Sequence, residues 1–142
     1  QAIDNFSNNK YDKSLDVKDF DTSFVKGLSI EDGCATVTKF TAFLISQGIE
    51  FINSKNKDSK TINLICGGGR KNNFLMKNIL DYLKNSQAKL YDIDNYGFDG
   101  DFIESQTFGF LAIRSFLKLP ISYPSTTKCK NPTIGGIINK NF

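Results

Sequence analysis

A short apolar run, three consecutive glycines and an amphipathic segment follow one another near the middle of the chain. Residues 61–66 (TINLIC) are rich in aliphatic and β-branched side chains, which is typical of a buried strand. After the glycines, Asn72 is a suitable N-cap, and apolar residues recur every three or four positions up to Leu83. The pattern predicts a strand, a glycine turn and a helix.

A long helix is predicted before this unit, from Ser29 to Asn53. Ser29 and Asp32 resemble a capping box, although Asp is a weaker partner there than Glu. The apolar residues that step by three or four are Ile30, Cys34, Val37, Phe40 and Leu44. Further apolar positions widen this face, so we expect the helix to pack on something broad, such as a sheet.

A second long helix is predicted from about Asp101 to Leu119, where Pro120 stops it. Asp99 or Asp101 can cap its start. Apolar residues occupy almost the whole helical wheel, which predicts burial on more than one side. Glu104 is an unusual carboxylate in the first turn of such a helix. It either interacts favourably with the helix dipole or faces a ligand in a cleft.

Shorter segments complete the pattern. Residues 88–92 are predicted to form a second strand, 94–100 and 123–127 to form loops, and 134–138 to form a short final strand. Residues 1–28 are predominantly polar and predict a connecting segment. The order of helix, strand, helix, strand and helix leaves connections long enough for parallel strands.

The glycine turn is the first candidate for function. Glycine permits positive φ angles and has no Cβ atom, so another molecule can approach the backbone closely. The free N–H groups at the start of the following helix suit a nucleotide or a phosphate. A tight turn that holds no ligand explains the three glycines equally well.

Composition narrows the class of protein. The chain has 142 residues, of which 39% are hydrophobic and 13% aromatic, as in a folded domain. The 18 basic and 15 acidic residues are scattered, so the net charge of +3 does not indicate a nucleic-acid partner. No apolar run approaches the roughly 20 residues that span a bilayer, and no signal peptide is evident. We therefore expect a cytoplasmic protein without a membrane partner.

Cysteine and histidine usage restricts the chemistry further. Three well-separated cysteines and no histidine predict reduced thiols and argue against a zinc site or a histidine-dependent catalytic group. The first residue is Gln1 and not Met, so we expect the chain to begin within a longer protein.

Two nucleotide-binding designs share the predicted element order. In a Rossmann half, an acidic residue follows the glycine turn by roughly 20 positions, where Asp92 and Asp94 lie. The glycines here are consecutive, however, and Arg70, Lys71 and Asn72 follow them. In the C-terminal lobe of actin-like sugar kinases, a glycine pair or triplet after a strand forms the adenosine-binding turn.

Four segments together resemble the C-terminal part of the anhydro-N-acetylmuramic acid kinases. They are GLSIEDGCATVTKFTA (27–42), LICGGGRKN (64–72), GFDGDFIESQTFGFLA (97–112) and PSTTKCKNPTIGGI (124–137). GGGxxN marks a broad group, whereas GDFIES, an aromatic-rich helix and PSTT are narrower in combination. The resemblance covers nearly the whole chain from Lys13 onward. Where the family usually has Thr-Gly, this chain has Thr127-Lys128, so the role of that glycine is not carried over.

The resemblance implies an α/β fold that is part of an actin-like ATPase domain, of the ribonuclease H-like, hexokinase and heat-shock-70 class. Such a domain has three layers, with helices packed on a small mixed sheet. The implied reaction uses ATP and Mg²⁺ to phosphorylate the 6-oxygen of 1,6-anhydro-N-acetylmuramic acid while water opens the anhydro bridge. The product is N-acetylmuramic acid 6-phosphate, an intermediate of peptidoglycan recycling.

The resemblance also implies site residues. Those that match the family's adenosine-binding turn are Gly67, Gly68, Gly69 and Asn72, and Glu104 matches a carboxylate that faces the sugar. Arg70 and Lys71 are near enough in sequence to hold phosphates, or are solvated. Magnesium is expected to be held through the nucleotide phosphates with few protein ligands, so no metal site is expected in this chain.

Kinases of this class also need a glycine-rich phosphate loop and a catalytic aspartate, and phosphoryl transfer depends on such positioning groups. Nothing before Ser29 resembles either. We therefore expect no catalytic residue in this chain, and expect those residues in an N-terminal portion supplied in cis or in trans. Residues 1–28 would connect to that portion, and 29–142 would form a C-terminal nucleotide-binding lobe that is inactive alone.

The expected partners are ATP, the sugar substrate, the N-terminal portion and, in one arrangement, a second copy in a homodimer. Two alternatives stay open. One is a non-catalytic remnant or assembly module of the same fold, and the other is a Rossmann-type dinucleotide- or adenosylmethionine-binding domain.

Overall fold

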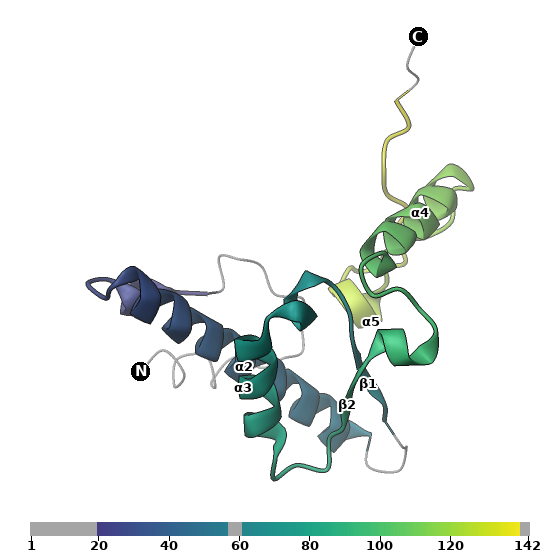
Figure 1. The fold of residues 1–142 in the computed structure, drawn as a ribbon. Helices are drawn as coiled ribbons and strands as arrows, with labels where there is room; N and C mark the ends of the chain where they lie inside the picture. Colours follow the sequence, from purple (N-terminus) through teal and green to yellow (C-terminus); the bar gives the residue numbers. More distant parts are fainter. Residues whose placement is uncertain (1–19, 57–60, 140–142) are drawn as a thin grey trace.

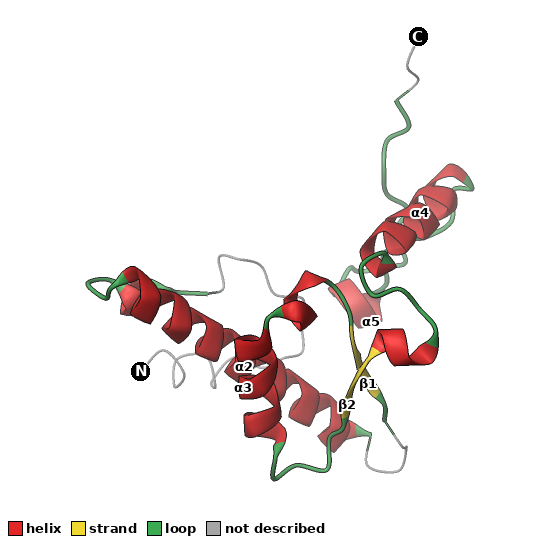
Figure 2. Cartoon of the chain, in the orientation of Figure 1, coloured by secondary structure: helices red, strands yellow, loops and turns green. Residues whose placement is uncertain are grey.

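The computed structural model describes residues 20–56 and 61–139, and Figures 1 and 2 show its elements. The helices are α2 (Ile30–Lys55), α3 (Asn73–Leu83), α4 (Ile103–Phe116) and α5 (Pro124–Thr127); the strands are β1 (Asn63–Ile65) and β2 (Leu90–Asp92). Short 3-10 turns are η2 (Ser23–Val25), η3 (Gly68–Lys71) and η4 (Ile93–Tyr96). Within these described ranges, no helix is both long enough and apolar enough to cross a membrane.

The N-terminal part of the chain is described only from residue 20 onward. Residues 1–19 of the expected connecting segment lie outside the described residues, and 20–28 contain η2. Helix α2 then begins as the sequence predicts, because the Asp32 backbone N–H donates to Ser29 Oγ at 3.1 Å. The Ser29 hydroxyl donates to Asp32 Oδ2 at 3.0 Å. This pair of hydrogen bonds fixes the first turn of α2.

The core lies where α3 crosses α2. Ala42 of α2 and Ile79 and Leu83 of α3 are buried, and the ring of Phe43 meets Tyr82 edge-on at a centroid distance of 5.8 Å. Partly buried residues packed around this core are Ile49, Leu75, Met76, Ala88 and Leu90. The apolar face predicted for α3 is therefore the face that it buries. Leu90 joins the sheet to the helix pair.

Strands β1 and β2 pair in parallel, which agrees with the predicted strand–helix–strand order. The paired residues are Asn63 with Leu90, Leu64 with Tyr91, and Ile65 with Asp92. Leu64 and Tyr91 are exposed while their neighbours along each strand are half-buried. The prediction of a buried strand was wrong, because the described residues leave one side of this pair uncovered. The described part is thus a helix-rich α/β unit with a small parallel sheet. The three-layer domain with helices packed on a mixed sheet stays a prediction.

Helix α4 departs from prediction at both ends. Neither Asp99 nor Asp101 caps it: Phe102 occupies the N-cap position without a side-chain hydrogen bond. Asp99 Oδ1 accepts the backbone N–H of Asp101 at 3.0 Å instead. At the other end the helix stops at Phe116, before Pro120, and Lys118 takes a positive φ of 54°.

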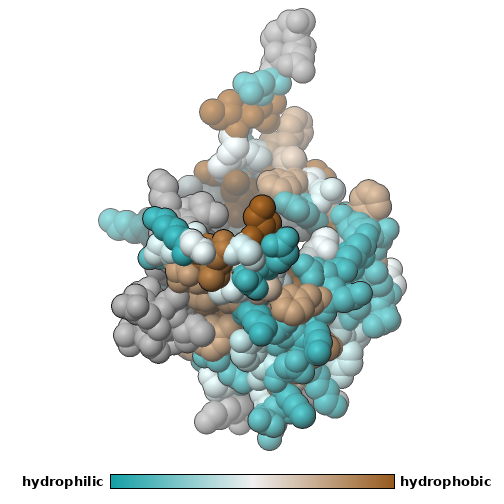
Figure 3. Space-filling model, turned by 60° about the vertical axis from the view of Figure 1, so that its left-hand side comes forward, coloured by the Kyte–Doolittle hydropathy of each residue, from teal (hydrophilic) through white to brown (hydrophobic). Residues whose placement is uncertain are grey.

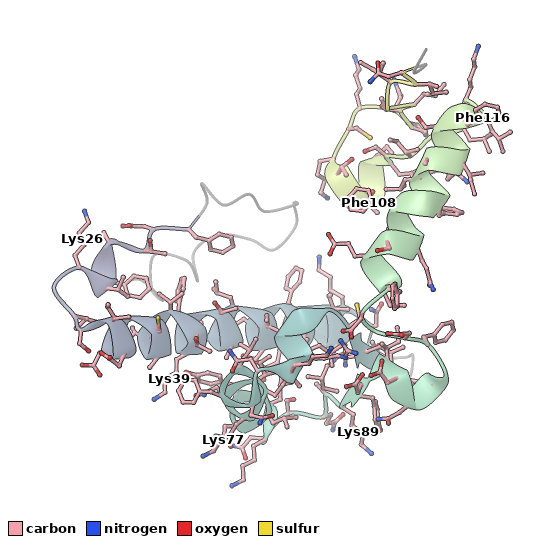
Figure 4. The ribbon with its side chains drawn as sticks, turned by 45° about the horizontal axis from the view of Figure 1, so that its top comes forward. Lys26, Lys39, Lys77, Lys89, Phe108 and Phe116 are labelled. Atoms are coloured by element: carbon pink, nitrogen blue, oxygen red, sulfur yellow. The ribbon has the colours of Figure 1, made fainter. Side chains whose placement is uncertain are left out.

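The burial predicted for α4 was also wrong for the described residues. No residue of α4 is buried, and the helix extends away from the α2–α3 pair (Figures 1 and 4). Phe108 and Phe116 are 64% and 69% exposed. Figure 3 shows hydrophobic side chains gathered at the surface in the upper part of the molecule, where α4 and the C-terminal segment lie. Exposed apolar faces of this kind are typical of interaction surfaces or of aggregation-prone proteins.

The C-terminal segment lies beside α4 without forming the predicted strand. Thr133 makes an isolated antiparallel bridge with Ser122, and Gly136 has a φ of +87°, which interrupts an extended strand. The Ser115 hydroxyl of α4 donates to the carbonyl oxygen of Gly135. Residues 124–127, expected to be loop, form the single turn α5 with Pro124 at its start.

We expect the chain on its own to self-associate, because α4 exposes a contiguous apolar surface. Replacing Phe108 and Phe116 together with Ser should lower the mass measured by light scattering. The matched change Phe98→Ser, at a 56% exposed loop position, should leave it unchanged. A monomeric parent chain that melts cooperatively above about 65 °C, the top of the usual mesophile range, would contradict this.

Candidate functional site

The glycine turn connects β1 to α3. Gly67 has φ 81° and ψ 171°, and Gly68–Lys71 then form η3. Asn72 caps α3, since its side-chain oxygen accepts the backbone N–H of Leu75 at 3.0 Å. The expectation of positive φ holds for Gly67 and not for Gly68 or Gly69. Asn72 is therefore explained locally as a helix cap, whatever else it contacts.

The turn has free space around its backbone. A Cβ atom added at Gly67 or Gly68 would meet no other heavy atom within 4 Å. At Gly69 it would meet only Leu75 Cδ2, at an ordinary contact distance of 3.6 Å. Internal packing therefore does not require glycine at positions 68 and 69, which are exposed. A ligand that approaches the backbone at these positions would require it.

Arg70 lies at the centre of a charged cluster that closes one side of the turn. Its side chain is only 6% exposed and faces three carboxylates. The ion pairs are Nη1 to Asp101 Oδ1 at 2.5 Å, Nη2 to Asp94 Oδ2 at 3.0 Å and Nε to Asp92 Oδ1 at 3.5 Å. Nη1 also donates to the Gly67 carbonyl oxygen at 3.0 Å. The planar guanidinium thus contacts the ends of both strands and the start of the α4 region.

The same cluster fixes the loop before α4. Gly100 is buried, and its carbonyl oxygen accepts the Gly67 backbone N–H at 2.9 Å. The Gly100 backbone N–H donates to Asp94 Oδ1 at 2.7 Å. A Cβ atom at Gly100 would come within 2.9 Å of both the Arg70 guanidinium and Asp94 Oδ1. A side chain at position 100 would therefore have to displace the ends of the Arg70 and Asp94 side chains.

The contacts of the cluster shift the pKa values of Asp101, Asp94 and Arg70. Lys71, foremost, and Arg70 hold the pKa of Asp101 below its usual value. The Gly100 N–H and then Arg70 do the same for the pKa of Asp94. The hydrogen bonds of Asp101 and Asp94 raise the pKa of Arg70. Because these carboxyl pKa values are lowered in the folded chain, the cluster stabilises the fold at any pH above the ordinary carboxyl pKa. This contribution to stability is lost only as pH falls below about 4.

These contacts correct the expectation for Arg70, whereas Lys71 is largely solvated, as one of the two alternatives had it. Arg70 is neither solvated nor free to hold a phosphate, because its donors are directed at carboxylates. Lys71 is 62% exposed but pairs with Asp101 at 2.5 Å. The two cations and three carboxylates of this cluster together carry a net charge of −1, and a cluster with that net charge does not attract a phosphate. Asp92 and Asp94, the candidate Rossmann acids, serve as partners of Arg70.

Glu104 lies in the first turn of α4 and is exposed. It has no hydrogen-bond or ion-pair partner among residues 20–56 and 61–139. Asp101, three residues earlier in the loop before α4, is held by Arg70 and Lys71. The structure thus connects the glycine turn to the start of α4 through Asp101 and leaves the Glu104 carboxylate available.

The backbone conformation at position 128 explains why the resemblance leads one to expect glycine there. It ends α5 in the left-handed conformation, with φ 59° and ψ 21°, and its N–H donates to the Pro124 carbonyl oxygen at 3.2 Å. Glycine adopts this conformation without a Cβ penalty. The glycine therefore has a conformational role at this position, which Lys128 fulfils under strain.

We expect Lys128→Gly to stabilise the chain by about 0.5–1 kcal/mol. Relief of a left-handed non-glycine residue is worth about 1–2 kcal/mol, and the added freedom of glycine in the unfolded chain offsets part of it. Chemical denaturation of the chain measures the difference. Lys128→Ala is the matched control and should give no gain, because alanine keeps the Cβ atom.

Comparison with known proteins identifies the family to which the residues of this site belong. The family model described as anhydro-N-acetylmuramic acid kinase matches residues 9–141. The chain belongs to this kinase family. Its four motif segments all lie within the matched range, so the resemblance seen in them is confirmed.

Individual kinases of this family are similar over most or all of the chain. The anhydro-N-acetylmuramic acid kinase of Pelagibacter ubique is 54% identical over 100% of the chain and 38% of its own length. That of Zymomonas mobilis is 40% identical over 89% of the chain and 33% of its own length. The anhydro-N-acetylmuramic acid kinase 2 of Jannaschia sp. is 38% identical over 90% of the chain and 32% of its own length. The chain thus spans roughly a third of the length of these relatives.

The cluster around Arg70 is what sequence reasoning missed. Its members are Arg70, Lys71, Asp92, Asp94, Gly100 and Asp101. The available signal was a basic pair after the turn and several acids after the second strand, on elements predicted to be parallel neighbours. Among the described residues, no group of three or more Cys, Asp or Glu side chains is arranged to hold a metal ion.

Proposed function

We propose that this chain supplies the nucleotide-binding lobe of a cytoplasmic, ATP-dependent kinase of peptidoglycan recycling. The kinase phosphorylates and hydrolyses 1,6-anhydro-N-acetylmuramic acid to N-acetylmuramic acid 6-phosphate. Membership in a family of that name supports the substrate and the reaction class. The observation that carries the nucleotide assignment is the exposed turn at Gly68 and Gly69, where packing leaves free space.

In this proposal the backbone of Gly67, Gly68 and Gly69 receives the adenosine part of ATP, and Asn72 holds the turn in shape by capping α3. When bound with the nucleotide, Mg²⁺ neutralises charge on the phosphates. The Glu104 carboxylate accepts hydrogen bonds from sugar hydroxyls. The surrounding domain is an actin-like α/β domain, in which 29–142 form the C-terminal lobe.

The catalytic groups lie in an N-terminal portion that meets this lobe in cis or in trans, and residues 1–28 connect the two. Phosphoryl transfer depends on positioned charges and an oriented nucleophile, which this lobe does not supply alone. The test is a chimera in which the chain replaces the matching part of the Pelagibacter ubique kinase. We expect the chimera to phosphorylate the anhydrosugar and the chain alone to be inactive. A folded but inactive chimera would count against the proposal.

A non-catalytic assembly module of the same fold is the second candidate. The exposed apolar face of α4 favours it, since such a face suits a partner chain. Calorimetric titration with ATP separates the two. Binding supports the nucleotide-binding lobe, and a folded chain that binds neither ATP nor ADP supports the module.

A further inference from the structure

Helix α4 is held to the rest of the described chain by a small joint, which we define as the contacts between the glycine turn and residues 100 and 101. None of its residues is buried, and it projects away from the α2–α3 pair (Figures 1 and 4). The glycine turn, in contrast, is attached to the core through α3, whose Ile79 and Leu83 are buried. Whatever fixes residues 100 and 101 to the turn therefore determines where α4 starts.

The contacts across that joint converge on Arg70. On the side of the turn, its Nη1 donates to the Gly67 carbonyl oxygen at 3.0 Å. On the side of α4, the same Nη1 lies 2.5 Å from Asp101 Oδ1. The second terminal nitrogen binds Asp94, whose Oδ1 accepts the Gly100 N–H at 2.7 Å. One planar group thus holds three backbone segments in register.

We propose that Arg70 is a positioning residue, which sets the start of α4, and with it Glu104, relative to the glycine turn. The inference rests on the proposed function, in which the turn and Glu104 contact nucleotide and sugar respectively. Arg70 contacts neither ligand in this account. It acts through Asp101, which lies three residues before Glu104, and through the Gly67–Gly100 backbone hydrogen bond.

The geometry requires arginine and not simply a positive charge. A guanidinium presents five donors in a rigid plane, and here it reaches Asp92, Asp94, Asp101 and the Gly67 carbonyl oxygen. A lysine ammonium has a single nitrogen and is unable to span these acceptors at once. Lys71 does not replace Arg70, because Lys71 pairs with Asp101 Oδ2, whereas the Arg70 guanidinium donates to Asp101 Oδ1.

The test uses the chimera with the Pelagibacter ubique kinase and the variants Arg70→Gln and Arg70→Lys. We expect Arg70→Gln to lower kcat for the anhydrosugar at least 10-fold and to change KM for ATP less than threefold. Arg70→Lys should recover only part of the loss. Asp101→Asn should resemble Arg70→Gln, and the double variant should be no worse than either. Lys77→Gln, an exposed cation on α3, is the matched control and should behave as the parent (Figure 4).

Amide hydrogen exchange on the chain itself gives an independent readout. Arg70→Gln should speed exchange at the Gly67 and Gly100 amides, whereas exchange at Ile79 in the α3 core should be unchanged. Unchanged exchange at the two glycines overturns the inference even if the chimera does not fold. An active parent chimera with an equally active Arg70→Gln variant also overturns it, and leaves the proposed function standing. An inactive but folded parent chimera overturns both.

Discussion

Gly68→Val is expected to lower the affinity for ATP and ADP at least 10-fold while the chain stays folded. The added side chain would occupy space that is empty in the structure, since a Cβ atom at Gly68 has no neighbour within 4 Å. Among the described residues, no atom therefore opposes the substitution sterically. A nucleotide that approaches the turn would meet a branched side chain, and a 10-fold loss corresponds to about 1.4 kcal/mol.

The choice of position 68 separates a ligand effect from a folding effect. Gly67 has a φ of 81°, so a substitution there would strain the backbone with or without ligand. Gly33, in the first part of α2, also has no neighbour around its Cβ position. Gly33→Val is therefore the matched control, and calorimetric titration should give it the affinity of the parent. Equal affinity in the Gly68→Val variant would remove the nucleotide assignment from the turn.

The elements that could be predicted from the sequence are those that local patterns determine. The cap of α2 at Ser29 and the cap of α3 at Asn72 each depend on residues three positions apart. The apolar periodicity of α3 identified Ile79 and Leu83, which form the core with Ala42. The parallel pairing of β1 and β2 followed from the length of the connection between them.

The features that could not be predicted depend on contacts distant in sequence or on backbone angles. Arg70 and Asp101 are 31 positions apart, and no periodic pattern connects them. The composition of α4 predicted a helix buried on more than one side, which was wrong for the described residues. Composition does not say which surface provides the cover, and the described residues do not provide it. For position 128, only the backbone angles explain the preference for glycine.

Glu104→Gln is expected to reduce turnover of the anhydrosugar 10–100-fold in the chimera and to leave ATP affinity unchanged. The carboxylate has no partner among the described residues, so its oxygens are available to sugar hydroxyls. A neutral amide of the same shape keeps the packing and weakens a charge-assisted hydrogen bond. The loss corresponds to about 1.4–2.7 kcal/mol of transition-state stabilisation.

The competing account is that Glu104 only interacts with the dipole of α4. In that case the substitution would cost at most about 1 kcal/mol of stability and leave turnover nearly unchanged. Glu31→Gln is the matched control, because Glu31 occupies the first turn of α2 and is likewise exposed. Both variants should lose similar small amounts of stability, whereas only Glu104→Gln should lose turnover. A Glu104→Gln chimera within twofold of the parent in kcat/KM for the sugar would show that this carboxylate serves the helix and not the substrate.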